Sequence, residues 1–210
     1  MKTIDISKWN RKKYYEYYKN YQYPLFSINV DIDISLLIKY IKSKELSFFS
    51  SFLYVVMKAI NQIDEFKYRI REDTVILHDV VHPSYTVLND EDNYVFCNTD
   101  FTDSFNEFIK NVKNSIDIAK KGDNLEDDES KDDLIFISSL PWISFQSVTH
   151  PIDTANPDSF PRVTFGKYRL ENNIYKIPLS IAAHHGLCDG LHVARFLKIL
   201  DEEIKDLTKN

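Results

Sequence analysis

The sequence predicts an α/β fold of the two-layer kind, in which a large mixed β-sheet carries helices on one side. Apolar, β-prone segments recur along the chain, for example at 25–34 and 174–183. Segments with apolar residues at helical spacing lie between them, for example at 51–63 and 103–121. Hydrophobic residues make up 43% of the 210 positions, which allows a substantial core, and this length favours a single domain over residues 1–210.

The N-terminal third predicts a helix, a strand and two further helices. Ser7 or Asn10 could cap the first helix, which is unusually rich in tyrosine. Residues 25–34 alternate in polarity, so one face of the strand is apolar and carries Phe26, Ile28, Val30 and Ile32. A short helix is expected at 34–44, and 51–63 predicts a buried helix.

Short runs of β-formers dominate the middle of the chain. The segments 66–70, 74–78 and 84–88 favour a meander, and 93–97 favours a further strand. Residues 103–121 then predict a long amphipathic helix.

The stretch 122–133 is dominated by Asp and Glu and is the one strong shift in composition. It lacks the glycine and oxygen-ligand spacing of a calcium loop, so we expect a solvated connection and not a cation site. A short buried strand is expected directly after it, at 134–138.

Charge and hydropathy exclude several classes of protein. A net charge of −6 and a pI near 5.5 argue against nucleic acid or an anionic membrane as the main partner. No run approaches the ~18 apolar residues of a membrane span, and the N-terminus lacks the apolar core of a signal peptide. The sequence therefore predicts a cytoplasmic protein.

Cysteine and histidine spacing gives little support for a metal site or a disulfide. Cys97 and Cys188 are the only cysteines and form no Cys-x-x-Cys pair. Cys188 could be a nucleophile, but free cysteine is more often a small buried hydrophobe. His78 and His82 have the spacing of a helical metal site, yet their surroundings predict strand and turn, so no metal is expected.

The segment from His184 to Gly190 reads His-His-Gly-Leu-Cys-Asp-Gly and lies where a predicted strand gives way to a helix. His185 would leave the strand with its imidazole free, and a reference pKa of about 6.5 suits a general base. Asp189 suits a helix cap, and Gly190 tolerates backbone angles that other residues resist. A buried histidine bonded to backbone is the alternative for either histidine taken alone.

The run 184–196 closely resembles the active-site signature of the chloramphenicol acetyltransferases. A shorter form is shared with the dihydrolipoamide acyltransferases and the peptide-synthetase condensation domains. Four other blocks resemble the first family in order along the chain, at 5–12, 81–87, 137–145 and 164–168. The resemblance implies a chloramphenicol acetyltransferase-like fold over nearly the whole chain.

The resemblance also implies an acyltransferase that moves an acetyl group from acetyl-CoA to a hydroxyl of chloramphenicol, an antibiotic-resistance activity. His185 would be the general base, and Ser138, or alternatively Ser139, would stabilise the oxyanion. Arg11 would pair with Asp189 and so hold the loop that carries His185. Acetyl-CoA enters as a co-substrate, and the resemblance implies neither a metal nor a redox cofactor.

Binding residues are assigned by the same resemblance. Trp142, Lys167 and Tyr168 match positions around coenzyme A, where an aromatic plate and a cation would meet adenine and phosphates. The residues that would face the acceptor are Tyr18, Tyr94, Val148 and Thr164. Thr164 matches a threonine that holds a water near the acceptor. A homotrimer is implied, in which His185 of one chain faces the acceptor pocket of the next.

Several positions depart from the family pattern on the acceptor side. Residues 147–153 replace a run that begins with phenylalanine and touches the drug, Gln22 and Pro24 replace a leucine and a cysteine, and a lysine expected near Ser47 is missing. Two alternatives therefore stay open. One is the same acetyl transfer to a different hydroxyl acceptor, and the other is an inactive acyltransferase fold that acts as a binding protein.

Overall fold

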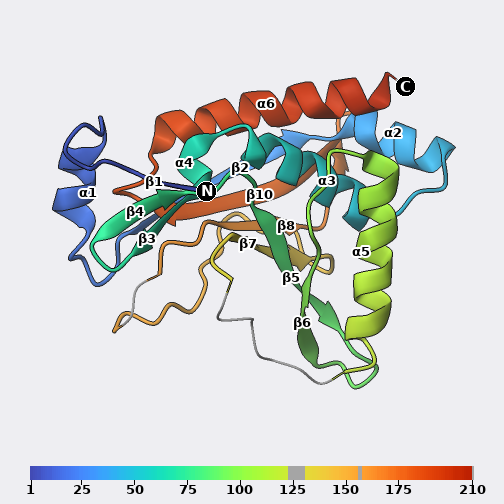
Figure 1. Cartoon of the computed structure of the whole chain (residues 1–210). Helices are drawn as coiled ribbons and strands as arrows, with labels where there is room; N and C mark the ends of the chain where they lie inside the picture. The colour runs from blue at the N-terminus through green and yellow to red at the C-terminus, as the bar shows by residue number, and fades with distance from the viewer. Residues whose placement is uncertain (123–130, 156–157, 210) are drawn as a thin grey trace.

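The computed structural model describes residues 1–122, 131–155 and 158–209, and its main feature is a seven-stranded sheet (Figure 1). The strands of this sheet are β2 (Leu25–Asp33), β5 (His82–Leu88), β6 (Tyr94–Asn98), β7 (Leu134–Leu140), β8 (Arg162–Gly166), β9 (Arg169–Glu171) and β10 (Ile174–His184). Their order is β2-β10-β8-β7-β5-β6, with β9 paired to the start of β10. The long strand β10 therefore runs through the interior of the sheet.

The sheet is mixed, as predicted. β10 pairs antiparallel with both β2 and β8, whereas β7 pairs parallel with both β8 and β5. The outer pair β5–β6 is antiparallel. The parallel pairs bring the ends of β7 and β8 to the same edge of the sheet, and residues expected to bind coenzyme A follow both strands.

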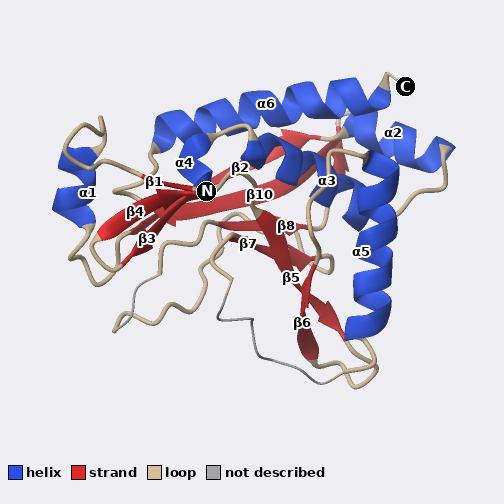
Figure 2. Ribbon diagram, in the orientation of Figure 1, coloured by secondary structure: helices blue, strands red, loops and turns tan. Residues whose placement is uncertain are grey.

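The helices are α1 (Lys12–Tyr18), α2 (Ser35–Ser43), α3 (Phe48–Asn61), α4 (Asp64–Lys67), α5 (Phe105–Ala119) and α6 (Gly190–Thr208). Figure 2 shows α2, α3, α5 and α6 on one side of the large sheet. The predicted two-layer α/β arrangement is therefore confirmed.

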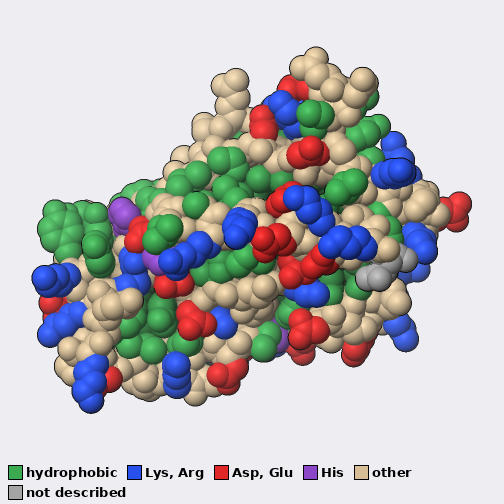
Figure 3. Space-filling model, turned by 90° about the horizontal axis from the view of Figure 1, so that it is seen from above, with side chains coloured by type: hydrophobic (Ala, Val, Ile, Leu, Met, Phe, Trp, Pro, Cys, Tyr) green, Lys and Arg blue, Asp and Glu red, His purple; other side chains and the backbone are tan. Residues whose placement is uncertain are grey.

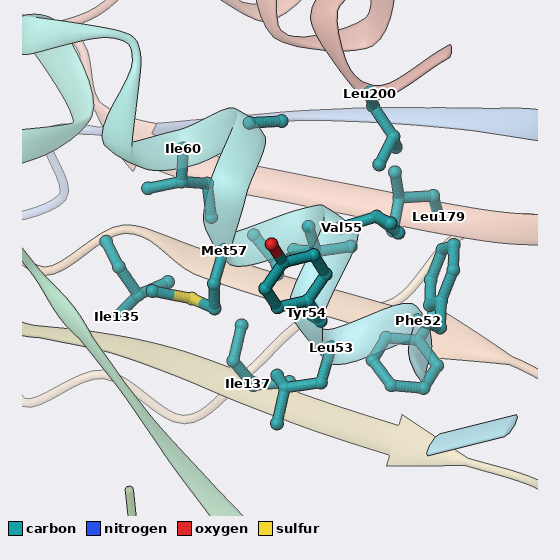
Figure 4. Close-up of a cluster of buried hydrophobic side chains, with 14 of the residues drawn as sticks. Phe52, Leu53, Tyr54, Val55, Met57, Ile60, Ile135, Ile137, Leu179 and Leu200 are labelled. Carbon is teal, nitrogen blue, oxygen red and sulfur yellow. The ribbon is translucent and has the colours of Figure 1, made fainter. Parts of the chain in front are cut away.

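The core lies between that sheet and α3, the most apolar helix. Figure 4 shows Phe52, Val55 and Met57 of α3 among side chains of β7, β10 and α6. All three are fully buried. Burying a side chain of this size stabilises the folded state by roughly 1.5–3 kcal/mol relative to exposure, before the cost of conformational entropy.

The two faces of the sheet differ because successive strand residues point to opposite sides. Ile137, Val163 and Ile181 face the helices and belong to the core. The alternate residues Ser138 and Thr164 therefore face the other side. No helix of the described part of the chain covers that face (Figure 2). Phe160 stacks there on Phe136 of β7, with ring centroids 4.8 Å apart.

A second, three-stranded sheet corrects the predicted meander. Its order is β1-β4-β3, from β1 (Lys2–Thr3), β4 (Thr74–Leu77) and β3 (Tyr68–Arg71). The prediction of a strand over 66–70 was wrong at its start, because α4 extends to Lys67. The strand β5 leaves this group and joins the large sheet, which local periodicity does not reveal.

Two predictions about local structure were also wrong in detail. α1 begins after Arg11 with no side-chain cap, because Ser7 bonds Asp5 and does not reach the helix. α3 begins before the predicted 51–63, at Phe48, because Ser47 caps it by accepting the N–H of Ser50.

The predicted solvated connection at 122–133 lies mostly outside the described residues. At its described end, Asp132 is held by two hydrogen bonds from Arg71, at 2.6 and 2.7 Å. This residue is therefore tied to the small sheet.

The outer face of α6 is charged. In Figure 3, which looks down onto the helical layer, acidic and basic side chains are interspersed with apolar ones. Lys198–Glu202 and Lys205–Asp201 form ion pairs one turn apart on α6. Within the described part of the chain, no helix is long and apolar enough to cross a membrane.

Candidate active site

His185 is the first residue after β10, and backbone bonding fixes its place. Its N–H donates to the carbonyl oxygen of Pro24 at 2.8 Å, which extends the β2–β10 pairing by one bond. The backbone of His185 is therefore fixed by the sheet. Its imidazole lies beside Tyr18, the last residue of α1.

The imidazole of His185 has a defined orientation. Nδ1 lies 3.2 Å from the carbonyl oxygen of Cys188. Because a carbonyl oxygen only accepts, Nδ1 carries the hydrogen, and the neutral ring has its lone pair on Nε2. Tyr18 stacks on the ring with centroids 4.7 Å apart, and Phe26 packs against it at 4.8 Å. The site thus holds one oriented basic nitrogen.

Asp189 and Arg11 hold the loop together, as predicted. Asp189 caps α6 by accepting the N–H of Leu191 at 3.0 Å. Arg11 Nη1 donates to Asp189 Oδ2 at 2.8 Å, and Nη2 donates to the carbonyl oxygen of His185 at 3.4 Å. The guanidinium, 6% exposed, therefore links the cap residue to the backbone of the candidate base.

The charge on Asp189 is stabilised by these contacts. Partial burial alone would raise the pKa of its carboxyl group, but the hydrogen bond from Arg11 and the nearby His192 outweigh burial and lower the pKa. Asp189 therefore stays ionised at neutral pH. This suits a structural partner of Arg11.

His192 also supports the loop, and sequence reasoning missed it. Its Nδ1 accepts the N–H of Asp189 at 3.1 Å, completing a capping box, and its Nε2 lies 3.1 Å from Glu65 Oε1. Burial lowers the pKa of this histidine despite the two carboxylates. The signal available in the sequence was a polar residue three positions after the cap, the spacing of a capping box.

The remaining loop residues are structural. Cys188 is 1% exposed, and burial raises the pKa of its thiol, so the structure gives no support to a nucleophilic thiolate. Gly186 is closely packed, because a Cβ there would lie 3.0 Å from the His184 ring. The prediction that Gly190 supplies unusual backbone angles was wrong, since no glycine among the described residues has a positive φ.

A cleft of about 950 Å³ opens at the edge where β7 and β8 end. It brings together Trp142, Lys167 and Tyr168, the three residues predicted to bind coenzyme A, and Ser138 also lines it. Lys120, from the end of α5, also lines it. This second cation was missed because nothing in the sequence places the end of α5 beside β8.

A smaller cavity of about 310 Å³ lies on the helix-free face of the sheet. Ser138, Thr164 and Tyr94 line it, together with the imidazole of His150. Ser138 and Tyr94 also line the cleft, so the two spaces adjoin at these residues, whereas Ser139 lines the cleft alone.

Two predicted acceptor residues lie apart from this cavity. Val148 is half-buried in the segment that carries His150 but lines neither space. Tyr18 lies with His185 at the other end of β10. The aromatic wall of the cavity comes instead from Phe96 and Phe136.

His185 and Ser138 do not meet within one chain. Register places Ser138 beside Thr164, and Thr164 opposite Ser180 of β10. His185 lies further along the same chain direction by roughly 17 Å, taking about 3.3 Å per residue from Ser180. The two side chains are therefore too far apart within one chain to act on the same atom.

The described residues offer no obvious metal site. Among them, no three His, Cys, Asp or Glu side chains gather closely enough to hold an ion.

Comparison with known proteins adds to this geometry. A family model described as chloramphenicol acetyltransferase matches residues 1–201. The chain belongs to the chloramphenicol acetyltransferase family. A relative from Escherichia coli of that name is 31% identical over 95% of this chain and 92% of its own length. Another, from Staphylococcus aureus, is 32% identical over 92% of this chain and 91% of its own length.

Solved structures agree on the fold of the family. A chloramphenicol acetyltransferase superposes with a TM-score of 0.89 at 26% identity, covering 97% of this chain and 99% of the other. A probable dihydrolipoamide acetyltransferase from Listeria monocytogenes has a TM-score of 0.71 at 16% identity, covering 95% of this chain and 91% of its own. The second likeness is one of fold alone.

Proposed function

We propose that this protein is an O-acetyltransferase that transfers the acetyl group of acetyl-CoA to a hydroxyl of chloramphenicol. Membership of the chloramphenicol acetyltransferase family makes it an acyltransferase. The observation that carries the proposal is the tautomer of His185, whose Nδ1–H donates to the Cys188 carbonyl and leaves Nε2 free to accept a proton. Residues 1–210 act as one catalytic unit in this proposal.

The large cleft suits coenzyme A. Trp142 and Tyr168 offer aromatic surfaces for an adenine ring, and Lys167 and Lys120 offer cations for phosphates. Lys120 compensates for the lysine that is missing near Ser47. When bound there, acetyl-CoA would supply the acetyl thioester.

The reaction then needs two groups from the protein. His185 Nε2 takes the proton of the acceptor hydroxyl while that oxygen attacks the thioester carbonyl. Ser138 lies where the cleft and the smaller cavity adjoin, and its hydroxyl donates to the oxygen that becomes negative. A donor of this kind in a dry site is worth roughly 3–4 kcal/mol of transition-state stabilisation. The carbon–sulfur bond then breaks, the carbonyl forms again on the acetylated acceptor, and coenzyme A leaves as a thiolate that takes up the proton held by His185.

The two groups come from different copies of the chain. Because His185 and Ser138 are separated within one chain, we infer that His185 of one copy faces Ser138 of the next. In a homotrimer with closed three-fold symmetry, every interface would bring His185 of one chain to Ser138 of its neighbour, which gives three sites. The exposed aromatic residues Tyr17 and Tyr21 beside Tyr18 supply an apolar surface for such a contact.

A thiol-release assay tests the proposal. The protein incubated with acetyl-CoA and chloramphenicol should release free coenzyme A, and His185→Ala should lower kcat by at least ~10³-fold because the base and its positioning are lost. Cys188→Ala is the matched control from the same loop. It should stay within about threefold of wild type, since a buried neutral thiol takes no part.

The other outcomes are equally informative. Thiol release that His185→Ala leaves unchanged would remove His185 from the mechanism. Release with other hydroxyl compounds but not with chloramphenicol would replace the acceptor and keep the reaction. Binding of coenzyme A without any turnover would identify an inactive binding protein.

A further inference from the structure

His150 is a histidine that the proposed mechanism does not use. It lies in the segment that crosses the helix-free face of the sheet, and its half-buried ring lines the 310 Å³ cavity. Its Nε2 is 2.7 Å from Oγ1 of Thr164. This threonine is 1% exposed, so its hydroxyl is almost wholly enclosed by protein and by the cavity.

Thr164 is the immediate neighbour of Ser138. The two residues are register partners on the parallel strands β8 and β7, and both side chains line the same cavity. Neighbouring strands lie about 4.8 Å apart, so two hydroxyl groups stand side by side on this face. Ser138 also lines the cleft, so the pair lies next to the point where the cavity adjoins the cleft.

We propose that His150 is a positioning residue for acyl transfer, and that it turns the Thr164 hydroxyl hydrogen toward the reacting groups beside Ser138. His150 Nε2–H donates to Thr164 Oγ1, so the hydroxyl's own hydrogen is free to donate into the cavity. Accepting one hydrogen bond also strengthens the next bond that a hydroxyl donates. This inference rests on the proposed function, because it concerns the same reaction site.

Hydrogen-bond satisfaction favours this tautomer. Within the described part of the chain, Nε2 has Thr164 as a partner, whereas no acceptor bonds Nδ1. A hydrogen on Nε2 therefore has an acceptor in Thr164, whereas one on Nδ1 has no acceptor among the described residues. Burial and the nearby Arg162 lower the pKa of His150, so the ring is neutral at neutral pH. The charge of Arg162 is itself balanced by Asp158, which accepts from both terminal nitrogens.

Two variants of His150 separate positioning from packing. The side-chain amide of His150→Gln can place an N–H donor where Nε2 lies. The side chain of His150→Leu fills a similar space but has no hydrogen-bond donor. We expect His150→Leu to lower kcat about tenfold, which corresponds to about 1.4 kcal/mol, with the KM for acetyl-CoA unchanged. His150→Gln should stay within about threefold of wild type.

A double-mutant cycle with Thr164 completes the kinetic test. In a Thr164→Val background, His150→Leu should cause no further loss, because the hydroxyl that it positions is already absent. Equal losses in the Gln and Leu variants of His150 would overturn the proposal. So would additive losses in the double variant.

The tautomer of His150 can be measured in the absence of any acetyl acceptor. Two-dimensional nitrogen–proton NMR of the His150 ring should show the hydrogen on Nε2, and Thr164→Val should shift that nitrogen's signal. A hydrogen on Nδ1 would overturn the inference. If wild-type protein released no thiol with chloramphenicol, the proposed function would fail, and the NMR result would still decide the role of His150 toward Thr164.

Discussion

At the scale of single residues, two adjacent histidines have opposite properties because their surroundings differ. His185 stands at the surface of the loop with Nε2 available. His184 is 4% exposed, and its Nδ1 accepts the N–H of Gly186 at 3.1 Å. Burial lowers the pKa of His184 to about 4. The sequence pattern His-His does not distinguish the catalytic candidate from the structural one, but the environment does.

His184 predicts how stability depends on pH. Its folded pKa of about 4 lies below the unfolded value of 6.5, so the unfolded state binds more protons between these limits. The stabilising contribution of neutral His184 should be complete above pH 6.5. As the pH falls to 4, the free energy of unfolding should decrease by about 3 kcal/mol because of this residue. Urea unfolding at fixed protein concentration measures the change.

The comparison variant for this prediction is His184→Asn, whose side-chain oxygen can still accept the N–H of Gly186. It removes the titrating group, so its stability should vary less over the same pH range. Equal pH dependence in the two proteins would show that His184 titrates normally in the folded state.

At the scale of elements, the close approach of β8 to the segment after β7 shapes the cleft that is proposed to bind coenzyme A. A Cβ at Gly166 would lie 2.8 Å from the carbonyl oxygen of Ile143 and 2.8 Å from Cγ of Pro178. That carbonyl accepts the N–H of Lys167 at 2.7 Å. The glycine therefore lets two cleft-lining segments, which carry Trp142 and Lys167, lie against each other.

Gly166→Ala should disturb this contact. The added methyl group forces backbone apart, so we expect a loss of about 1–3 kcal/mol in the free energy of unfolding and a several-fold higher KM for acetyl-CoA. Thermal unfolding and steady-state kinetics measure the two effects. In Gly190→Ala the nearest heavy atom is 3.9 Å away, so its stability should match wild type to within about 1 kcal/mol. Similar losses in both variants would rule out the close contact as the cause.

At the scale of the whole molecule, the proposed mechanism requires assembly of several chains, because His185 and Ser138 are separated within one chain. The end of β10 carries His185, the proposed base, in a loop held by Arg11 and Asp189. Ser138 lies beside the cleft, on the helix-free face. In the proposed mechanism each chain supplies one group to each of two sites, and the trimer brings the two groups together.

Mixing two inactive variants tests this arrangement. His185→Ala retains Ser138, and Ser138→Ala retains His185, so mixed trimers contain some interfaces with both groups intact. Random assembly of equal amounts places a complete pair at one interface in four, so we expect about a quarter of wild-type thiol release. Each variant alone should stay inactive. No recovery after co-expression or refolding of the mixture would place the whole reaction within one chain.

The sequence by itself determined the two-layer fold and most of the strands and helices, and it predicted that the loop from His184 to Gly190 follows a strand and opens a helix. These properties follow from residue spacing and from contiguous motifs, which are local. Family resemblance added the pairing of Arg11 with Asp189, which are 178 positions apart. The predicted meander was wrong because strand pairing depends on long-range packing: β5 joins the large sheet, whereas β3 and β4 form the small one.

Only the tertiary structure decided which side chains share a space. Strand order and register placed Ser138 beside Thr164, and a loop crossing the sheet brought His150 onto that pair. Packing of α5 against the rest of the molecule likewise places Lys120, at the end of that helix, in the lining of the cleft. Such contacts join segments that are distant in sequence, so no periodicity encodes them. They are fixed by the packing of the whole chain, which sets which residues become neighbours.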